Sequence, residues 1–218
     1  MQTSIDVGRT VTNAPGATGP HTLEYLFHPR SVAVVGALSD PRKQGYMYVE
    51  MLKLFGYRGQ IYPVNVAGDE LLGLPIYRSL RDIPGEVDHV ISCVPATLVM
   101  SLVRQCVEKR VKSLHLYTGR MSETGEADRR DMELEIVEMA RAAGIRVIGP
   151  NCLGIYYPGE GLSFRYNLPR ESGSVAFISQ SGGNGAKLGY RGAVRGIRFG
   201  KKRIVCDWLV VRSSGELR

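Results

Sequence analysis

Cysteine is scarce in this chain: the 218 residues contain four, with no CxxC pair and no cluster with histidine. This spacing argues against a zinc or other metal site and fits reduced cysteines in a cytoplasmic protein. No apolar run approaches the roughly 20 residues needed to cross a membrane. The first 20 residues also lack the apolar segment of a signal peptide, so we expect a flexible leader over residues 1–22.

Acidic residues become rare toward the carboxyl end. The chain has a net charge of +7, and eight basic but only two acidic residues lie between Arg191 and Arg218. Nearly all of the net charge therefore belongs to that segment. A basic face on a folded domain, which is the usual footprint of a nucleic-acid-binding protein, is not indicated. We expect neither a nucleic-acid partner nor a membrane partner.

Short β-branched runs alternate with helical patterns from Arg30 onward. The patterns predict strands over 31–35, 60–64, 88–94, 113–117 and 146–148, and helices over 45–55, 96–109 and 128–143. Repeated strand-loop-helix units predict an α/β fold with a Rossmann-type, doubly wound parallel sheet. Ligands of such sheets bind beyond the carboxyl ends of the strands. The candidate loops are those that start at Gly36, Asn65, Pro95, Thr118 and Gly149.

The same patterns predict two domains. The first covers residues 23–154, and the stretch 155–172, rich in glycine, proline, tyrosine and asparagine, is predicted to be a linker. A strand over 174–178 then opens a second, flavodoxin-like α/β domain in residues 173–218. About 45 residues are too few to complete such a domain, so we expect its truncated start. We also expect the atypical basic tail after Gly200 to be poorly ordered or loosely docked.

The loop from Gly36 to Gly45 ends where a helix is predicted to begin. Free backbone N–H groups and the helix dipole at such a point favour an anionic phosphate. The glycine spacing is not GxGxxG, and the second strand ends in Asn65, where an NAD site places an aspartate or glutamate. Both departures disfavour NAD. A turn that binds nothing remains the alternative.

Three further loops offer groups with two interpretations. Pro95–Ala96 either lets a backbone approach a flat ligand or only ends the strand. Glu123, in the loop that starts at Thr118, either accepts a hydrogen bond or lies at the start of the next helix. Asn151 offers both a donor and an acceptor. Cys152 has no histidine beside it to activate a thiolate, so we predict that it packs against a ligand.

The segment Ser179–Gly183 directly follows a predicted strand. Two hydroxyls and two glycine amides at a helix start form an anion cradle, although the lysine of a Walker loop is missing. A plain N-capping turn is the alternative, but one serine would suffice for it. We predict that phosphate is bound by Ser179, Ser181, Gly182 and Gly183.

Taken in order, seven segments resemble the N-terminal part of ADP-forming acetyl-CoA synthetases, members of the NDP-forming acyl-CoA synthetases. They are similar, more distantly, to the α subunit of succinyl-CoA synthetase. Each segment alone is weak evidence, but the ordered set is specific and covers roughly residues 23–200. The segments are Leu26–Ala37, Lys43–Gly45, Ile61–Asn65, Gly73–Tyr77, Val94–Ala96, Gly149–Gly154 and Ser179–Gly183.

The resemblance implies a CoA-binding domain of an acid–thiol ligase, with coenzyme A or an acyl-CoA as its ligand. An ATP-grasp β subunit, or the remainder of the ligase, would be the protein partner. The resemblance assigns the nucleotide and phosphates to Gly36, Ala37, Ser39, Lys43, Gln44 and Gly45. It assigns the path toward the thiol to Asn65, Pro95, Ala96, Thr118, Asn151 and Cys152. The Ser179–Gly183 turn would be one of the helix starts that cradle a phosphorylated histidine.

Three departures from the family pattern limit what the resemblance implies. Ala67 stands where the family often has lysine, and Arg120 stands where it has phenylalanine. The family's phosphohistidine lies further downstream, and none of the four histidines matches it: His21, His28, His89 and His115. We therefore expect a CoA-binding fragment of a truncated or frameshifted ligase, with no catalytic residues and no synthetase activity alone. The alternatives are a stand-alone CoA-responsive module and, less favoured, an NAD-dependent oxidoreductase or redox sensor.

Overall fold

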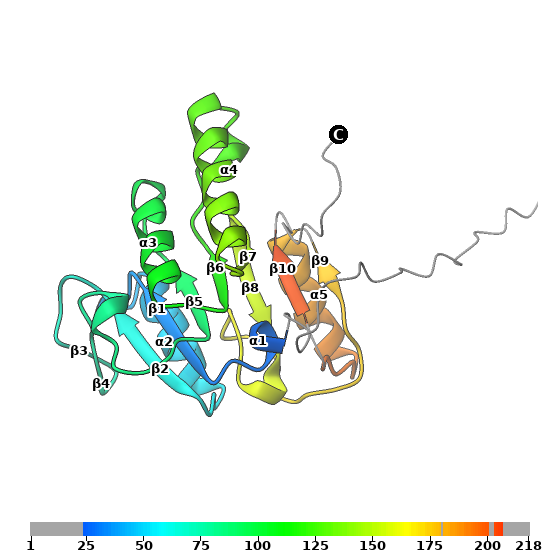
Figure 1. Cartoon of the computed structure of the whole chain (residues 1–218). Helices are drawn as coiled ribbons and strands as arrows, with labels where there is room; N and C mark the ends of the chain where they lie inside the picture. The colour runs from blue at the N-terminus through cyan, green and yellow to red at the C-terminus, as the bar shows by residue number, and fades with distance from the viewer. Residues whose placement is uncertain (1–23, 180, 201–202, 207–218) are drawn as a thin grey trace, which may run out of the picture.

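A computed structural model describes residues 24–179, 181–200 and 203–206 (Figure 1). The predicted leader and most of the basic tail lie outside these ranges. In chain order the elements are α1 (Glu24–Phe27), β1 (Ser31–Val35), α2 (Gln44–Leu54), β2 (Gln60–Val64), β3 (Glu70–Leu71), β4 (Leu74–Pro75), η1 (Leu80–Asp82), β5 (His89–Ser92), α3 (Ala96–Glu108), β6 (Ser113–Leu116), η2 (Ser122–Thr124), α4 (Ala127–Ala142), β7 (Arg146–Ile148), β8 (Cys152–Tyr156), η3 (Pro158–Glu160), β9 (Ile178–Ser179), α5 (Gly182–Val194) and β10 (Arg203–Cys206).

The central sheet has five parallel strands in the order β2-β1-β5-β6-β7. Neighbouring side chains of β1 point to opposite faces, as the pleat requires. Val32 and Val34 pack in the core cluster that contains the buried side chains of α2, whereas Ala33 packs in the cluster of α3 and α4. Helices thus cover both faces, and the predicted doubly wound parallel sheet is confirmed. Every element predicted for it is present, with ends that differ by at most two residues.

The order of the strands creates a switch point between β1 and β5. From β1 the chain passes through α2 to β2 on one side, and it then returns to β5 on the other side of β1. The two connections leave in opposite directions, and in doubly wound sheets this is the point beyond which a ligand crevice forms. Gly36 and Cys93 follow these two ends and are in contact through the backbone of the turn. Ligands of doubly wound sheets occupy this position.

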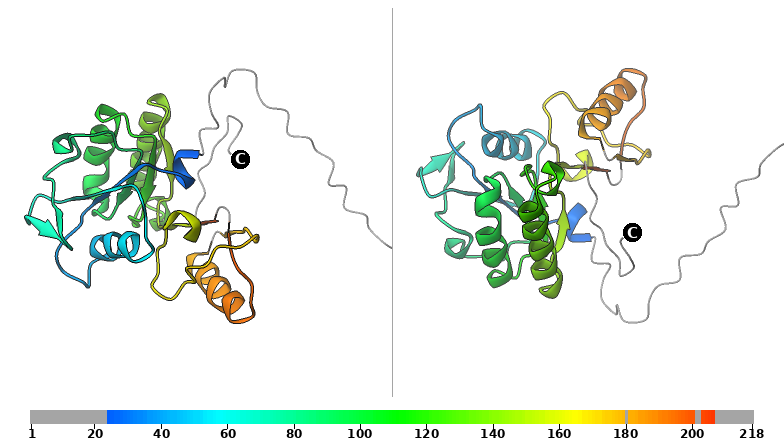
Figure 2. Two further views of the ribbon diagram at one scale, coloured as in Figure 1. Left: turned by 90° about the horizontal axis from the view of Figure 1, so that it is seen from below. Right: turned by 90° about the horizontal axis from the view of Figure 1, so that it is seen from above.

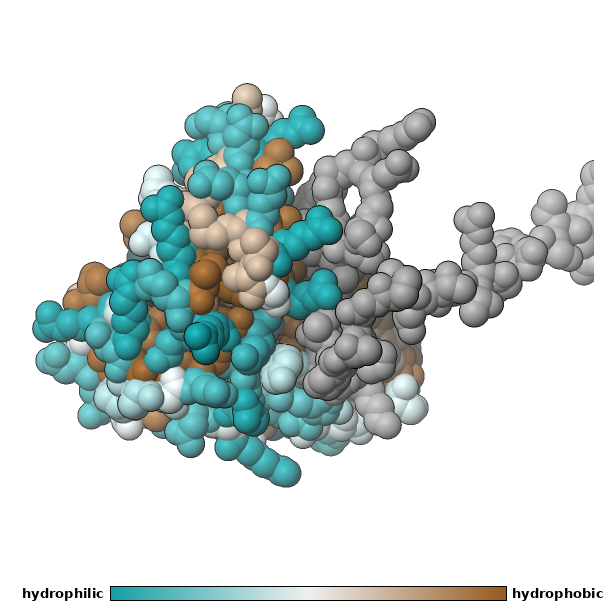
Figure 3. All heavy atoms as spheres, viewed as in Figure 1, coloured by the Kyte–Doolittle hydropathy of each residue, from teal (hydrophilic) through white to brown (hydrophobic). Residues whose placement is uncertain are grey.

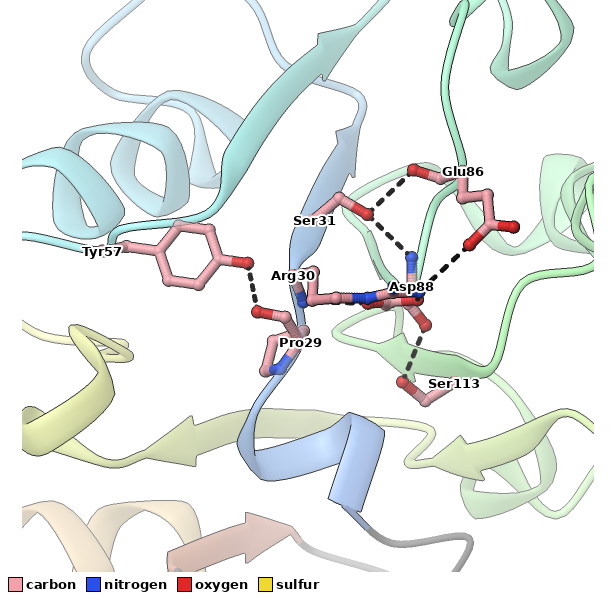
Figure 4. Close-up of polar contacts among 7 residues, drawn as sticks. All are labelled: Pro29, Arg30, Ser31, Tyr57, Glu86, Asp88 and Ser113. Atoms are coloured by element: carbon pink, nitrogen blue, oxygen red, sulfur yellow. Dashed lines mark hydrogen bonds and ion pairs between the residues drawn. The ribbon is translucent and has the colours of Figure 1, made fainter. Parts of the chain in front are cut away.

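A polar network ties the opposite, amino-terminal ends of β1 and β5 together (Figure 4). The carboxylate of Asp88 is 1% exposed and accepts hydrogen bonds from the backbone N and Nε of Arg30 at 2.9 and 3.0 Å. Ser31 Oγ donates to Glu86 O and accepts from Asp88 N. Burial alone would raise the pKa of Asp88, but the hydrogen bonds and charge of Arg30 outweigh it and lower that pKa. The polar groups at this amino-terminal end of the sheet are paired with each other, so we look for a ligand site at the carboxyl edge.

Residues 155–172, predicted as a linker, are packed into the molecule. Strand β8 runs across the predicted boundary at residue 154, and Tyr156, Leu162 and Phe164 are buried in the same cluster as α2. The Tyr156 hydroxyl donates to the carbonyl of Pro169. Aperiodic aromatic residues gave no local signal because their partners are distant in the sequence. The division into domains stays a prediction.

A second, three-stranded sheet follows in the order β8-β10-β9, with β10 antiparallel to β8 and parallel to β9. Strand β9 covers only Ile178–Ser179, not the predicted 174–178, although Val175 forms a single bridge to Phe199. Within the predicted tail, Arg203–Cys206 form a strand that pairs with β8 and β9, and the remaining tail residues lie outside the described ranges. The sequence did not predict this strand, because the β-branched pair Ile204-Val205 is short and directly follows three basic residues.

Helix α5 packs against β9 and β10 at the side of the molecule away from the first sheet (Figure 2). On the face shown in Figure 3, hydrophilic residues surround scattered apolar ones. None of the helices within the described ranges is both long and apolar enough to cross a membrane. The described residues also contain no group of three or more histidine, cysteine, aspartate or glutamate side chains placed to hold a metal ion.

Candidate functional site

The turn after β1 passes very close to β5. Gly36 has a φ of +92°, and a Cβ at this position would lie 2.7 Å from the carbonyl oxygen of Cys93. Its backbone N donates to Val64 O of β2 at 2.9 Å. Only glycine fits both the conformation and the space. The turn is therefore held against the ends of β2 and β5, at the switch point.

The first turn of α2 is pressed onto this same turn. A Cβ at Gly45 would lie 2.2 Å from Gly36 O and 2.8 Å from Ala37 Cα. Both neighbours are backbone atoms, which cannot rotate away as a side chain would. A larger residue at Gly45 would therefore disturb the fold, whatever its effect on a ligand.

Comparing substitutions of two glycines at equivalent helix positions tests whether the close contact at Gly45 is what makes a larger residue destabilising there. Gly45 and Gly183 are each the second residue of their helix, and the space around Gly183 is open for 4 Å. We expect Gly45→Ala to lower the free energy of unfolding by about 3 kcal/mol through overpacking. Gly183→Ala is expected to leave it unchanged or raise it by up to about 1 kcal/mol, because alanine favours helix. Urea unfolding measures both; equal effects would show that the Gly45 contact is not tight.

The start of α2 suits an anion. Lys43 is the exposed N-cap residue, and the first turn of the helix contains no acidic residue. The nearby carboxylate of Asp40 is engaged by Arg42, whose hydrogen bonds lower the pKa of Asp40 to about 2. Within the described ranges Lys43 forms no salt bridge. Its charge and the helix dipole therefore act together at the switch point.

A buried polar atom without a partner lies next to Lys43. The side-chain oxygen Oε1 of Gln44 is buried and accepts no hydrogen bond from the described residues. Such an atom costs free energy unless a donor reaches it. Among the predicted site residues that the structure describes, Gln44 thus has the buried side-chain acceptor that no donor reaches.

Other predicted site residues have partners within the chain. Ser39 Oγ donates to Glu70 O at 3.1 Å, and Asn65 Oδ1 accepts from Ala67 N at 3.0 Å. Thr118 Oγ1 donates to Val94 O at 2.7 Å. These contacts shape the loops at the carboxyl edge of the sheet.

The three residues with open interpretations, Pro95, Ala96 and Glu123, each have a structural contact. Pro95 is the N-cap of α3, and Ala96 begins that helix with 8% exposure. Glu123 accepts hydrogen bonds from the backbone N atoms of Arg120 and Met121, so it closes its own loop. Arg120 itself is exposed, with a φ of 62°.

A pocket of about 170 Å³ brings together two groups of residues that are distant in the sequence. The turn Asn151–Cys152 lines one side, and Gly182–Gly183 at the start of α5 lines the other. Tyr117 and Arg165 complete the wall together with Leu153. Sequence reasoning missed Tyr117, which directly follows β6, and Arg165, which lies in the segment predicted as a linker. Burial raises the pKa of Tyr117, so its hydroxyl remains protonated and can donate.

The turn before α5 uses both of its serines to hold its own shape. Ser181 is the N-cap, and its side chain accepts from Asn184 N at 3.3 Å. Ser179 Oγ donates to Ser181 O at 2.9 Å, and Ser181 N donates back to Ser179 Oγ at 3.2 Å. The capping alternative therefore accounts for both hydroxyls. The glycines, and not the serines, face the pocket.

Cys152 is built into the core. Its side chain is 1% exposed and disulfide-bonded, so the expectation of a reduced cysteine is wrong here; the partner sulfur lies outside the described side chains. The Sγ accepts from Gly154 N at 3.3 Å, and Cys152 O accepts from His115 Nε2 at 2.8 Å. Cys93 and Cys106 are free thiols.

The three histidines that the structure describes contact other parts of the fold and lie outside the pocket. His28 Nδ1 lies 3.1 Å from Glu160 Oε1. His89 and His115 are buried and stacked, with ring centroids 6.3 Å apart, and burial lowers the pKa of His89 to about 3 and that of His115 to about 4. None of the three lines the pocket.

Comparison with known proteins identifies the fold's family. The family described as CoA binding domain matches residues 30–158. The chain belongs to this CoA-binding family. The α subunit of acetate–CoA ligase [ADP-forming] II from Pyrococcus furiosus is 43% identical over 82% of this chain and 39% of its own length.

Two further relatives agree with the resemblance seen in the sequence. The dinucleotide forming acetyl-coenzyme A synthetase 1 of Ca. Korarchaeum cryptofilum, solved with phosphate and ADP, is 36% identical with a TM-score of 0.77, covering 84% of this chain and 39% of that one. A succinate–CoA ligase α subunit of Archaeoglobus fulgidus is more distant, at 29% identity over 64% of this chain and 47% of its own length. The predicted similarity to the CoA-binding part of ADP-forming acyl-CoA synthetases is confirmed. The chain spans about two fifths of the length of the acetate–CoA ligase α subunits that it matches.

Proposed function

We propose that this chain binds coenzyme A in the crevice at the switch point between β1 and β5. The nucleotide and its phosphates lie along Gly36, Ala37, Ser39 and the start of α2 at Lys43–Gly45. The pantetheine arm passes the ends of β2, β5 and β6 at Asn65, Pro95–Ala96 and Thr118. Its thiol end points toward the Asn151–Cys152 turn. Family membership and the position of ligands in doubly wound sheets both support this path.

The vacant acceptor on Gln44 carries the proposal. A buried carboxamide oxygen requires a donor, and the amino group of an adenine or a hydroxyl of a ribose supplies one. The adjacent Lys43 and the dipole of α2 supply the charge that a phosphate needs. The residues present therefore fit a ligand that combines phosphates with hydrogen-bond donors, as CoA does.

The pocket at the start of α5 is the proposed meeting point of the thiol and a phosphate. Its volume of about 170 Å³ takes a small group, not a nucleotide. Gly182 and Gly183 contribute the helix start, and Arg165 contributes a cation that the sequence analysis did not foresee. Ser179 and Ser181 then act by shaping the turn that presents these amides.

We place this binding function within an acyl-CoA ligase whose chemistry needs further parts. A relative's α subunit implies a second subunit, so a nucleotide-binding partner or further ligase domains would complete the reaction. No described histidine lines the pocket, and His89 and His115 are locked in the core. We therefore expect this chain alone to form no acyl-CoA, and we place it in the cytoplasm, where CoA is available.

Isothermal titration calorimetry of the purified chain with CoA, acetyl-CoA and NAD tests the proposal. We expect saturable binding of CoA and acetyl-CoA, and at least about tenfold weaker binding of NAD, because Asn65 offers no carboxylate to the ribose. NAD binding tighter than CoA would favour the oxidoreductase alternative instead. Binding of CoA without any second subunit would equally suit a stand-alone module.

A further inference from the structure

The inward face of α5 is made of glycine. Gly182, Gly185, Gly189 and Gly192 are the buried residues of this helix. A Cβ at Gly192 would lie 2.5 Å from the Phe199 ring, and one at Gly182 would lie 2.8 Å from Leu153. The helix packs against its neighbours through backbone. Its larger apolar side chains are therefore not used in the core.

These larger side chains lie on the outward flanks. Leu188 is 46% exposed, Tyr190 52% and Val194 72%, and Ile197 just after the helix is 38% exposed. In both views of Figure 2, α5 lies at the edge of the molecule, away from the five-stranded sheet. Such a concentration of exposed apolar residues on one short helix is typical of an interaction surface.

A cationic row runs along the same outward face. Lys187, Arg191 and Arg195 recur every four residues, so they form one line on the helix. Helix α5 contains no acidic residue, and these three cations form no salt bridge with the residues that the structure describes. They border a groove of about 400 Å³ whose other lining residues are Asn184, Leu188, Gly192 and Ile197.

We propose that this groove is a docking site for an acidic, amphipathic helical segment of a partner protein. One or two apolar side chains of the partner fill the space over Gly192, between Leu188 and Ile197. Its carboxylates pair with Lys187, Arg191 and Arg195. Helices that bind grooves combine apolar anchors with flanking charges in this way. The groove lies on the outer flank of α5 and shares no lining residue with the pocket beside Asn151.

Charge and shape select this occupant over others. A second copy of the chain would place the same three cations against each other, which is costly. A concave groove with an apolar floor suits an inserted side chain better than a flat lipid surface or a nucleic-acid backbone. An acidic, amphipathic protein helix both pairs with the three cations and inserts an apolar side chain into the groove.

The test uses a fluorescent helical peptide with leucines every three or four residues on one face and glutamates beside them. Fluorescence anisotropy compares the wild-type chain with the variant Lys187→Glu/Arg191→Glu/Arg195→Glu. We expect at least about tenfold weaker binding to this variant. The control Arg58→Glu/Arg104→Glu/Arg130→Glu has the same charge change on exposed residues elsewhere and is expected to bind as the wild type does. A peptide with serine in place of leucine should bind at least about tenfold more weakly.

Four outcomes would overturn the proposal. They are no peptide binding to the wild type, equal loss in both charge variants, concentration-dependent dimerisation abolished only by the α5 variant, and tighter binding to anionic phosphatidylserine vesicles or duplex DNA than to the peptide. CoA titration of both variants keeps this test apart from the proposed function. The α5 variant is expected to bind CoA as tightly as the control variant does, and absence of CoA binding by the wild type would count against the CoA site alone.

Discussion

Replacing Lys43 by glutamate is expected to weaken CoA binding by about 30-fold or more. The substitution removes a cation from the start of α2 and places a carboxylate there, opposite the proposed phosphates. Loss of one charge-assisted hydrogen bond is worth about 2 kcal/mol, which corresponds to that factor. Stability should change in the opposite direction. An acidic residue at a helix N-terminus raises the free energy of unfolding by about 0.3–1 kcal/mol.

The matched control is Arg58→Glu, which makes the same change of charge at an exposed residue beyond the other end of α2. Calorimetry with CoA and urea unfolding are measured for both variants. Equal weakening by the two substitutions would mean that only the overall charge matters. Unchanged affinity in Lys43→Glu would place the phosphates elsewhere.

Acid is expected to destabilise the fold well above the pH at which its carboxylates protonate. His89 and His115 are buried side by side, and desolvation lowers their pKa values to about 3 and about 4, from 6.5 in an unfolded chain. Below pH 6.5 the unfolded chain takes up two protons that the folded chain refuses. Stability is therefore complete above pH 6.5 and is lost as pH falls, by about 1.4 kcal/mol per pH unit for each histidine. At pH 5 the loss would be about 4 kcal/mol.

Urea unfolding between pH 8 and pH 4.5 measures this slope. The single variants His89→Gln and His115→Gln should each halve it, and in His115→Gln the amide can still donate to Cys152 O. Asp88, whose pKa is lowered from 3.8, contributes its own loss only below this range. A free energy of unfolding that does not change from pH 7 to pH 5 would show that the folded protein admits protons to these rings.

The first sheet could be predicted from the sequence because its signals are local. Runs such as Ser31–Val35 are β-branched, and four of the five predicted strands are followed by a glycine, asparagine or proline, so strands and loops both carry a pattern. Because ligands bind beyond the carboxyl ends of parallel strands, the sequence alone also predicts that Gly36, Asn65 and Thr118 lie at the same edge of the sheet. Strand order, and with it the switch point between β1 and β5, needed the structure.

The rest of the site depends on contacts between distant parts of the chain. Arg165 faces Asn151 only because β8 and the packed segment after it fold back toward α5. The capping use of Ser179 and Ser181, and the backbone contact of Gly45, involve geometry that residue types do not reveal. Strand β10 could not be predicted for the same reason. Its pairing with β8 and β9 joins segments that are distant in the sequence.

The most direct test of the account is where CoA binds. Backbone amide chemical shifts of the labelled chain, recorded by NMR as CoA is added, map the contact surface. We expect the largest changes at Gly36–Gly45 and around Cys93–Ala96, with smaller ones at Asn151 and Gly183, and none at Arg30 and Asp88 on the opposite edge of the sheet. Changes confined to that opposite edge, or saturation without any change at Lys43–Gly45, would contradict a CoA site at the switch point.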